Sequence, residues 1–148
     1  MRTGVLMAKK NKAESVTNLF NLITNTNDKI KKVQSAHLST QKLTAPQFGV
    51  LDVLQRKGPM PLKKISDELM VTGANITCVM DNLEKEALVK RVPSKTDRRV
   101  INAELTPKGK QKLEKVYPEH IKTMNEFSKR FTESEMKQLT KLLEKLVD

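Results

Sequence analysis

The sequence predicts a mainly α-helical fold with a small β-hairpin. Apolar residues recur with helical spacing over most of the chain, and after Leu88 the period changes to the alternation of strands. Threonines that can cap helices precede several of the helical segments. The 148 residues fit one domain with helical extensions and leave no room for two large lobes.

A long amphipathic helix is expected near the N-terminus. Neither Pro nor Gly occurs between Glu14 and Leu38, and the apolar residues there recur at spacings of three, four and seven. Asn27 and Gln34 interrupt the apolar face of this helix, which suits packing against a partner. Residues 1–12 are expected to form a disordered basic N-terminus.

A second helix should follow Thr44. Thr44 and Gln47 have the spacing of a capping box, and Pro46 occupies the first turn, where its missing N–H costs nothing. The run Gly58-Pro59-Met60-Pro61 should stop this helix after Lys57. The expected inward residues are Phe48, Leu51 and Leu54.

Two shorter helices and a hairpin should come next. The helices are expected at Leu62–Met70 and Ala74–Ala87, separated by a turn, with Leu62, Ile65, Leu69, Ile76, Val79, Met80 and Leu83 inward. Residues 88–92 and 99–105 are β-branched and alternating, and a polar turn over 93–98 separates them. These two segments predict an exposed two-stranded hairpin.

The C-terminal part should contain two more helical segments. Thr106 and Pro107 open a helix, for which we expect a kink or break at Pro118. Thr132 and Glu135 form a second capping-box pattern before a last amphipathic helix.

The charge of the chain points to a polyanionic partner. Lys and Arg number 28 against 17 Asp and Glu, a formal net charge of +11. No apolar run approaches the roughly 20 residues of a membrane span, and the start lacks a signal-peptide core, so a cytoplasmic protein is expected. The few aromatic residues suit helical stripes rather than base stacking, which favours duplex over single-stranded nucleic acid.

Patterns typical of enzymes and of metal or cofactor sites are not found. The five glycines are too scattered for a phosphate loop, and no serine lies in a nucleophile elbow. Cys78, His37 and His120 lie far apart in the sequence and predict no metal site, and both histidines are expected at the surface or partly packed. We therefore expect neither catalysis nor a cofactor.

The order of two short helices, a tight turn and a basic hairpin is that of a winged helix-turn-helix. The helix after the turn has no acid in its first half, although a helix N-terminus favours acids, so this end can approach phosphates and base edges. We expect Asn75, Thr77 and Cys78 at base edges, with Thr72 and Ala74 nearby. The alternative is a solvated helix that Thr72 merely caps.

The hairpin tip is the second candidate contact with DNA. Lys95, Arg98 and Arg99 surround Asp97, and arginines of such a tip can enter a narrow minor groove. We expect Asp97 to hold Arg99 or Arg98 in position; the alternative is a solvated charged turn. Each further basic residue taken alone fits a solvated face better, and only their clustering argues for contacts with phosphate. These candidates are Lys63, Lys64, Arg91 and Lys108.

In several ordered stretches the sequence resembles the MarR (multiple-antibiotic-resistance regulator) family. The matching stretches are Leu43-Thr-Ala-Pro-Gln-Phe-Gly-Val-Leu, Ile76-Thr, Asn82-Leu-Glu-Lys, Leu88-Val-Lys-Arg, Asp97-Arg-Arg and Leu105-Thr-Pro-Lys-Gly. The resemblance covers about Leu38 to Lys115, while the first and last helices fit in position and pattern only.

The resemblance implies a cytoplasmic homodimeric transcription regulator, usually a repressor, which reads an inverted-repeat operator in double-stranded DNA. It implies a DNA-binding lobe over 41–117 and dimerisation helices over 13–40 and 118–148. A small aromatic effector is implied between these parts, and the stretches around Gly73 and Pro93 look most like the quinone- and hydroquinone-responsive subgroup. The implied dimer contacts are Val16, Leu19, Phe20, Ile23, Phe131, Leu139, Leu142, Leu143 and Leu146.

The sequence also departs from the family pattern. Arginine is common in the family where Cys78 and Asn82 stand here, so an operator sequence cannot be transferred, and Ala87 replaces a usual glycine. The first helix lacks the cysteine of redox-sensing relatives, which argues against peroxide sensing by that route. Two other functions stay open at this point: a non-specific architectural DNA binder and a winged-helix protein-interaction module.

Overall fold

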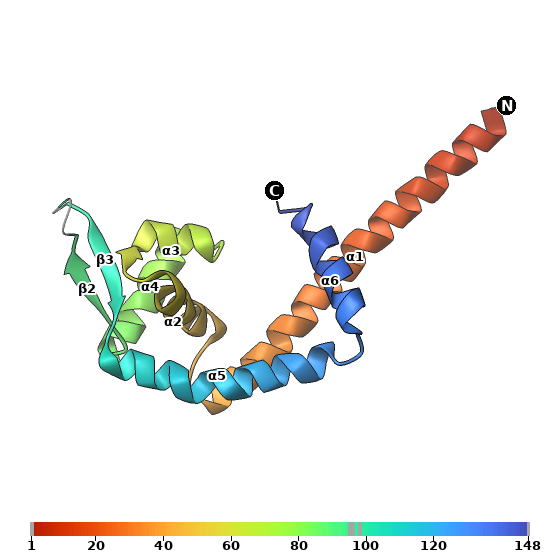
Figure 1. Ribbon diagram of the computed structural model, residues 1–148. Coiled ribbons are helices and arrows are strands. Elements are labelled where there is room, and N and C mark those ends of the chain that lie inside the picture. Colours follow the sequence, from red (N-terminus) through yellow and green to blue (C-terminus); the bar gives the residue numbers. More distant parts are fainter. Residues whose placement is uncertain (1, 95–96, 98, 148) are drawn as a thin grey trace.

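The computed structural model describes residues 2–94, 97 and 99–147, with the backbone alone for 2–11. The elements are α1 (Arg2–Thr40), α2 (Ala45–Lys57), β1 (Met60–Pro61), α3 (Leu62–Glu68), α4 (Gly73–Lys85), β2 (Val89–Pro93), β3 (Ile101–Leu105), α5 (Pro107–Ser128) and α6 (Glu133–Glu144). The prediction of a mainly helical fold with a small sheet is confirmed. Helices α2 to α4 and the sheet form one lobe. Helix α5 leads from this lobe to α6, which lies beside the long α1 (Figure 1).

The predicted helix starts are confirmed by their caps. The Thr44 hydroxyl accepts a hydrogen bond from the Gln47 N–H, and the Gln47 side chain accepts one from the Thr44 N–H at 2.9 Å. Thr132 and Glu135 make the same reciprocal pair at α6, and Thr106 caps α5. These side chains satisfy backbone donors that a helix start leaves free, so the termini can be read from local sequence alone.

One hydrophobic core holds the lobe together. Every buried hydrophobic residue that the structure describes lies between Leu38 and Val116. The inward residues expected of α2 and α4 are buried, whereas Leu62 and Leu69 are only partly buried at the edge of this core. The lobe therefore buries its apolar side chains without help from α6.

The sheet has a third strand that the sequence analysis missed. Met60 pairs with Ala103 and Pro61 with Asn102, which gives the antiparallel strand order β1-β3-β2. The stretch 58–61 reads only as a helix stop because a two-residue strand has no period to detect. Strand β3 also begins later than predicted, because the Val100 N–H closes a turn on the Asp97 carbonyl at 2.9 Å.

The start of α5 fits tightly against the end of the α4–β2 connection. A Cβ atom at Gly109 would lie 2.0 Å from the Leu88 carbonyl oxygen, so only glycine allows this approach. The Thr106 N–H and hydroxyl donate to the carbonyls of Leu88 and Ala87. The long α5 is thereby fixed to the lobe at its first turn.

Helix α5 does not break at Pro118, contrary to one of the two expected outcomes. It continues from Pro107 to Ser128, and the chain turns only at the Thr132 cap before α6. A proline removes one backbone hydrogen bond, and the packing of α5 on α1 and α2 outweighs this loss here.

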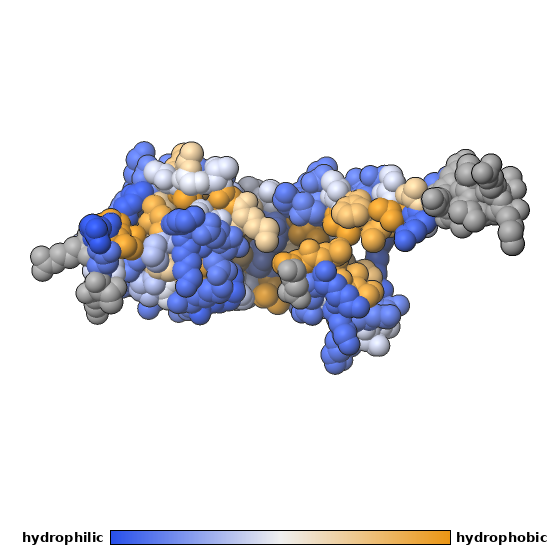
Figure 2. Space-filling model, turned by 90° about the horizontal axis from the view of Figure 1, so that it is seen from above, coloured by the Kyte–Doolittle hydropathy of each residue, from blue (hydrophilic) through white to orange (hydrophobic). Residues whose placement is uncertain are grey.

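The terminal helices leave many of their described apolar side chains exposed. Helix α1 continues back to Arg2, through the segment 1–12 that we predicted to be disordered, and packs on α2 and α5 near its other end. Helix α6 buries none of its residues. Seen from above, hydrophobic residues gather where α1 and α6 lie (Figure 2). The exposed ones include Val16, Leu19, Phe20, Phe131, Leu139, Leu142, Leu143 and Leu146, whereas Ile23 is half-buried.

Candidate nucleic-acid interface

Helix α4 presents a neutral polar N-terminal end to solvent. Thr72 caps the helix by accepting from the Asn75 N–H at 3.3 Å, and the first turn contains no acidic residue. The Thr77 hydroxyl donates to the Gly73 carbonyl at 2.9 Å and so is already used within the helix. All five residues predicted at this end are exposed: Thr72, Ala74, Asn75, Thr77 and Cys78. An anionic ligand would meet the positive end of the helix dipole here.

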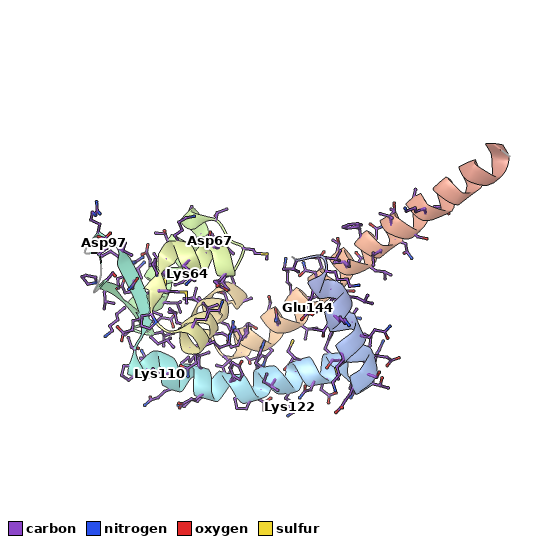
Figure 3. All side chains as sticks on the ribbon, turned by 45° about the horizontal axis from the view of Figure 1, so that its top comes forward. Lys64, Asp67, Asp97, Lys110, Lys122 and Glu144 are labelled. Atoms are coloured by element: carbon purple, nitrogen blue, oxygen red, sulfur yellow. The ribbon has the colours of Figure 1, made fainter. Side chains whose placement is uncertain are left out.

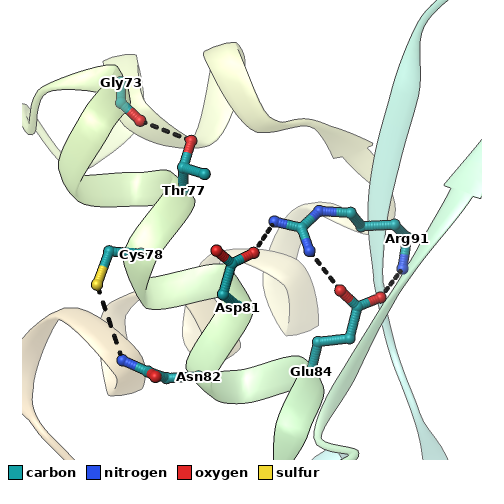
Figure 4. A network of polar contacts seen from close by, with 7 residues as sticks. All are labelled: Gly73, Thr77, Cys78, Asp81, Asn82, Glu84 and Arg91. Carbon is teal, nitrogen blue, oxygen red and sulfur yellow. Dashed lines mark hydrogen bonds and ion pairs between the residues drawn. The ribbon is translucent and has the colours of Figure 1, made fainter.

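The acids of α4 point toward the wing and are paired there. The Arg91 guanidinium of β2 bonds Asp81 at 2.6 Å and also bonds Glu84, while the Arg91 N–H donates to Glu84 at 3.1 Å (Figure 4). The bonds to Asp81 and Glu84 raise the pKa of Arg91, against a smaller opposing effect of burial. This bridge pairs both acids with one guanidinium, which offsets one of their two negative charges, and it ties the wing to α4.

The pairing gives Arg91 a contact within the lobe that the sequence analysis did not predict. The sequence places Arg91 on a basic strand. It does not indicate that Glu84 and Asp81, seven and ten residues earlier, bond this side chain. Its side chain is 27% exposed and is occupied by Asp81 and Glu84. In this structure Arg91 connects two elements of the lobe instead of reaching outward to phosphate.

The tip of the wing holds an exposed arginine. Arg99 donates from its backbone N–H and its Nε to Asp97 Oδ1, at 3.0 and 3.3 Å. The predicted positioning of Arg99 by Asp97 is thus present, and the Arg99 side chain remains 91% exposed. Lys95 and Arg98, predicted beside it, lie outside the described residues.

The predicted lysine contacts fall on two different sides of the lobe. Lys63 and Lys64 lie at the start of α3 and are exposed, with Lys63 3.6 Å from Asp67. Lys64 and Asp67 lie on the same side as Asp97 of the wing, whereas Lys110 of α5 lies on the opposite side (Figure 3).

Lys108 is the second candidate with a contact inside the lobe that the sequence analysis did not predict. It lies two residues before Lys110 in the first turn of α5, and its Nζ donates to the Glu86 carbonyl at 2.7 Å. That carbonyl belongs to the C-terminal end of α4, remote from the end that Thr72 caps. Lys108 therefore stabilises a helix C-terminus, where a cation is favourable.

A partly buried polar and aromatic cluster joins α1, α2 and α5. The His120 ring lies 4.4 Å from Phe48, 6.0 Å from His37 and 6.4 Å from Tyr117, measured between centroids. Both histidines are expected at the surface or partly packed, which is wrong for His120, because this side chain is buried at 8% exposure. Neither periodicity nor spacing indicated this cluster, because it depends on how α1 crosses α5.

Several polar atoms of this cluster lack a partner among the described residues. They are His37 Nε2, His120 Nδ1 and Asp52 Oδ1, all buried. Burial lowers the pKa of His120, and the nearby His37 lowers it further, which favours the neutral ring. Within the described part of the chain, no three His, Cys, Asp or Glu side chains are arranged to hold a metal ion.

Comparison with known proteins decides the family. The chain is 32% identical to the HTH-type transcriptional regulator MhqR of Bacillus subtilis over 133 residues, which cover 90% of this chain and 92% of MhqR. The sequence pattern of the MarR family matches residues 43–101. The chain belongs to the MarR family. Like other MarR proteins it is a DNA-binding transcription regulator and not an enzyme.

Two further relatives extend the comparison. The HTH-type transcriptional repressor MdtR of B. subtilis is 30% identical over 118 residues, which cover 80% of this chain and 76% of MdtR. The crystal structure of a mutant MarR from E. coli, complexed with operator DNA, has a TM-score of 0.82 and 26% identity, covering 90% of this chain and 96% of that one. The winged helix-turn-helix fold is thereby confirmed, and none of the described helices of the chain could span a membrane.

Proposed function

We propose that this MarR-family protein is a repressor that binds an inverted-repeat operator as a homodimer and is released by a small aromatic ligand. The observation that carries the proposal is the acid-free end of α4, with the exposed Arg99 of the wing on the same lobe. The helix N-terminus and its neutral side chains suit a major groove, and the wing arginine suits the flanking minor groove.

The exposed faces of α1 and α6 supply the argument for a dimer. Helix α6 has leucines along one face and buries none of them in a single chain. A second copy related by a two-fold axis would cover these side chains with the same side chains of its own. Two copies of α4 would then lie about 34 Å apart, the spacing of successive major-groove faces.

The junction of α1, α2 and α5 is the proposed effector site. Phe48, Tyr117 and His120 offer aromatic surface, and the unpartnered His37 Nε2 and His120 Nδ1 could bond a phenol or quinone oxygen. A ligand there would touch both the lobe and the dimerisation helices. By favouring one arrangement of the lobes over another, it would change the spacing of the two α4 helices.

Competition binding tests the operator proposal. A labelled duplex from the region upstream of the protein's own coding sequence is titrated at 0.15 M salt with random DNA as competitor. A specific reader should prefer its own site by roughly 1,000-fold or more. Equal competition by random DNA would instead indicate an architectural binder. If a variant with Lys95→Ala, Arg98→Ala and Arg99→Ala kept its function, the wing would serve protein interaction.

Ligand titration tests the effector proposal separately. A soluble catechol or methylhydroquinone should weaken the complex between protein and operator in a saturable way. His120→Ala should abolish this response while the ligand-free protein keeps its operator affinity. A response of the same size in the variant would contradict the proposed site, and no response of either protein to any phenol or quinone would contradict the ligand class.

A further inference from the structure

The outward strip of α4 carries two amide side chains and no arginine. Ala74, Asn75, Cys78 and Asn82 are exposed and follow one another at helical spacing along one side of α4. Cys78 and Asn82 lie on the side away from Arg91 of the wing (Figure 4). The structure describes every residue of α4. The only basic residue of this helix is Lys85, in the last turn. The strip that precedes Lys85 is therefore electrically neutral.

This composition limits which bases the strip can recognise. Guanine is read mainly by arginine or lysine, and cytosine donates to a carboxylate. The strip offers neither, because Asp81 and Glu84 face Arg91 and are paired with it. Asparagine, by contrast, can donate to N7 and accept from the N6 amino group of adenine at the same time, or the small residues can contact a thymine methyl group.

Both amides are free to make such bonds. None of the described residues hydrogen-bonds the Asn75 side chain, whose backbone N–H alone is held by Thr72. The Asn82 Nδ2 contacts the Cys78 sulfur at 3.9 Å, a weak bond that leaves the Oδ1 and a second N–H unused (Figure 4). Ala74 and Cys78 leave a small surface between them, suited to a methyl group.

We infer that Asn75 and Asn82 determine the operator sequence by reading two adenines on the major-groove edge, so that the half-site under α4 consists of A·T pairs. The inference rests on the proposed function, in which α4 lies in the major groove of an operator. The two residues are seven positions apart. At about 1.5 Å per residue this is about 10 Å along the helix, or about three base pairs at about 3.4 Å each.

Selection from a random duplex library tests the inference. The full chain, as purified, is used to enrich bound sequences over several rounds at 0.15 M salt. We expect an inverted repeat whose half-sites contain two adenines about three base pairs apart, within a block of A·T pairs. Asn75→Ala and Asn82→Ala should each relax the preference at one adenine, by roughly tenfold per position.

An atom-specific probe separates amide readout from an indirect effect. Replacing a selected adenine by 7-deaza-adenine removes the N7 acceptor and leaves base pairing intact. Wild type should lose about tenfold in affinity for the modified duplex, and the matching Asn→Ala variant should lose nothing further. Gln55→Ala, which removes an exposed amide of α2, is the matched control and should keep both the preference and the deaza effect.

The possible outcomes distinguish a failure of this inference from a failure of the proposed function. Enriched half-sites with guanines under α4, or adenine preferences that survive both Asn→Ala changes in folded protein, overturn this inference while the operator-binding proposal stands. Loss of affinity for the deaza duplex that is equal in wild type and variants also overturns it. A library from which no sequence is enriched overturns the proposed function and this inference together.

Discussion

The lobe and the terminal helices differ in how they bury apolar surface. The lobe encloses Val50, Leu51, Ile65 and Leu83 completely, with 0% exposure. Helix α6 leaves Leu142 51% exposed and Leu143 41% exposed. The same chain thus contains a region that is complete by itself and a region whose apolar face has no cover within one copy.

The difference indicates which residues contribute to stability only when two copies of the chain associate. A residue of the lobe core contributes to folding whatever the protein concentration, because all its neighbours come from the same chain. A residue of the α6 face contributes only when a second molecule covers it, and its effect must then depend on protein concentration. Substitutions of matched type in the two regions can separate these contributions.

Leu142→Glu should have the largest effect on DNA binding. A carboxylate in the α6 face would have to be buried without a partner, so we expect a monomer in analytical ultracentrifugation. A single half-site contact should then lower operator affinity by roughly 100-fold or more. Lys137→Glu places the same group on the opposite face of α6 and should leave a dimer. Dimers of equal stability in both variants would contradict the assigned interface.

Leu51→Ala should have the largest effect on the lobe. The side chain is fully buried, and its truncation leaves a cavity that should lower the free energy of unfolding by about 3 kcal/mol. Chemical denaturation at several protein concentrations should give the same loss each time. A loss that grows as the protein is diluted would show that the lobe, too, depends on a second copy.

Arg91→Gln tests whether the bridge matters for DNA binding. Without the guanidinium, Asp81 and Glu84 would carry unpaired negative charge beside the exposed strip of α4 that we propose to face the major groove. We expect a roughly tenfold loss of DNA affinity, with a loss of unfolding free energy of only about 1 kcal/mol. The combination with Asp81→Asn and Glu84→Gln should restore affinity. If it does not, Arg91 acts by a route other than charge neutralisation.

His120 should make stability depend on pH. Its pKa in the folded protein lies below the ordinary value of 6.5, so the unfolded chain takes up the proton first as the pH falls. The full contribution to stability is present above about pH 6.5 and is lost as the pH decreases through this value toward the folded-state pKa. His120→Gln should show a flatter dependence in thermal melts between pH 7 and 5. Parallel curves would contradict the assignment.

The smallest expected effect comes from backbone conformation. Ala87 has φ +57°, in the region where a Cβ atom is unfavourable. Ala87→Gly should raise the free energy of unfolding by up to about 1 kcal/mol. Gly58 has φ +77° in open space, so Gly58→Ala should lower it by a similar amount, about 1 kcal/mol. Melting temperatures that shift in the same direction for both would contradict this account.

The parts that local sequence determines could be predicted. Helix starts at Thr44, Thr106 and Thr132 depend on residues three positions apart, and the change of period at Leu88 reveals the wing. The Asp97–Arg99 contact is similarly local. The pairing of Arg91 and the burial of His120 could not be predicted, because their partners come from other elements, which neither period nor spacing relates to them. The two-residue β1 is simply too short to show a pattern.

Hydroxyl-radical footprinting on the region upstream of the protein's own coding sequence tests the central claim most directly. Two copies that place α4 in successive major grooves should protect two half-sites related by inversion, with centres about 10 base pairs apart. Arg99→Ala should remove protection at the outer minor-groove positions alone. A single unsymmetrical footprint, or uniform protection along the fragment, would contradict the account.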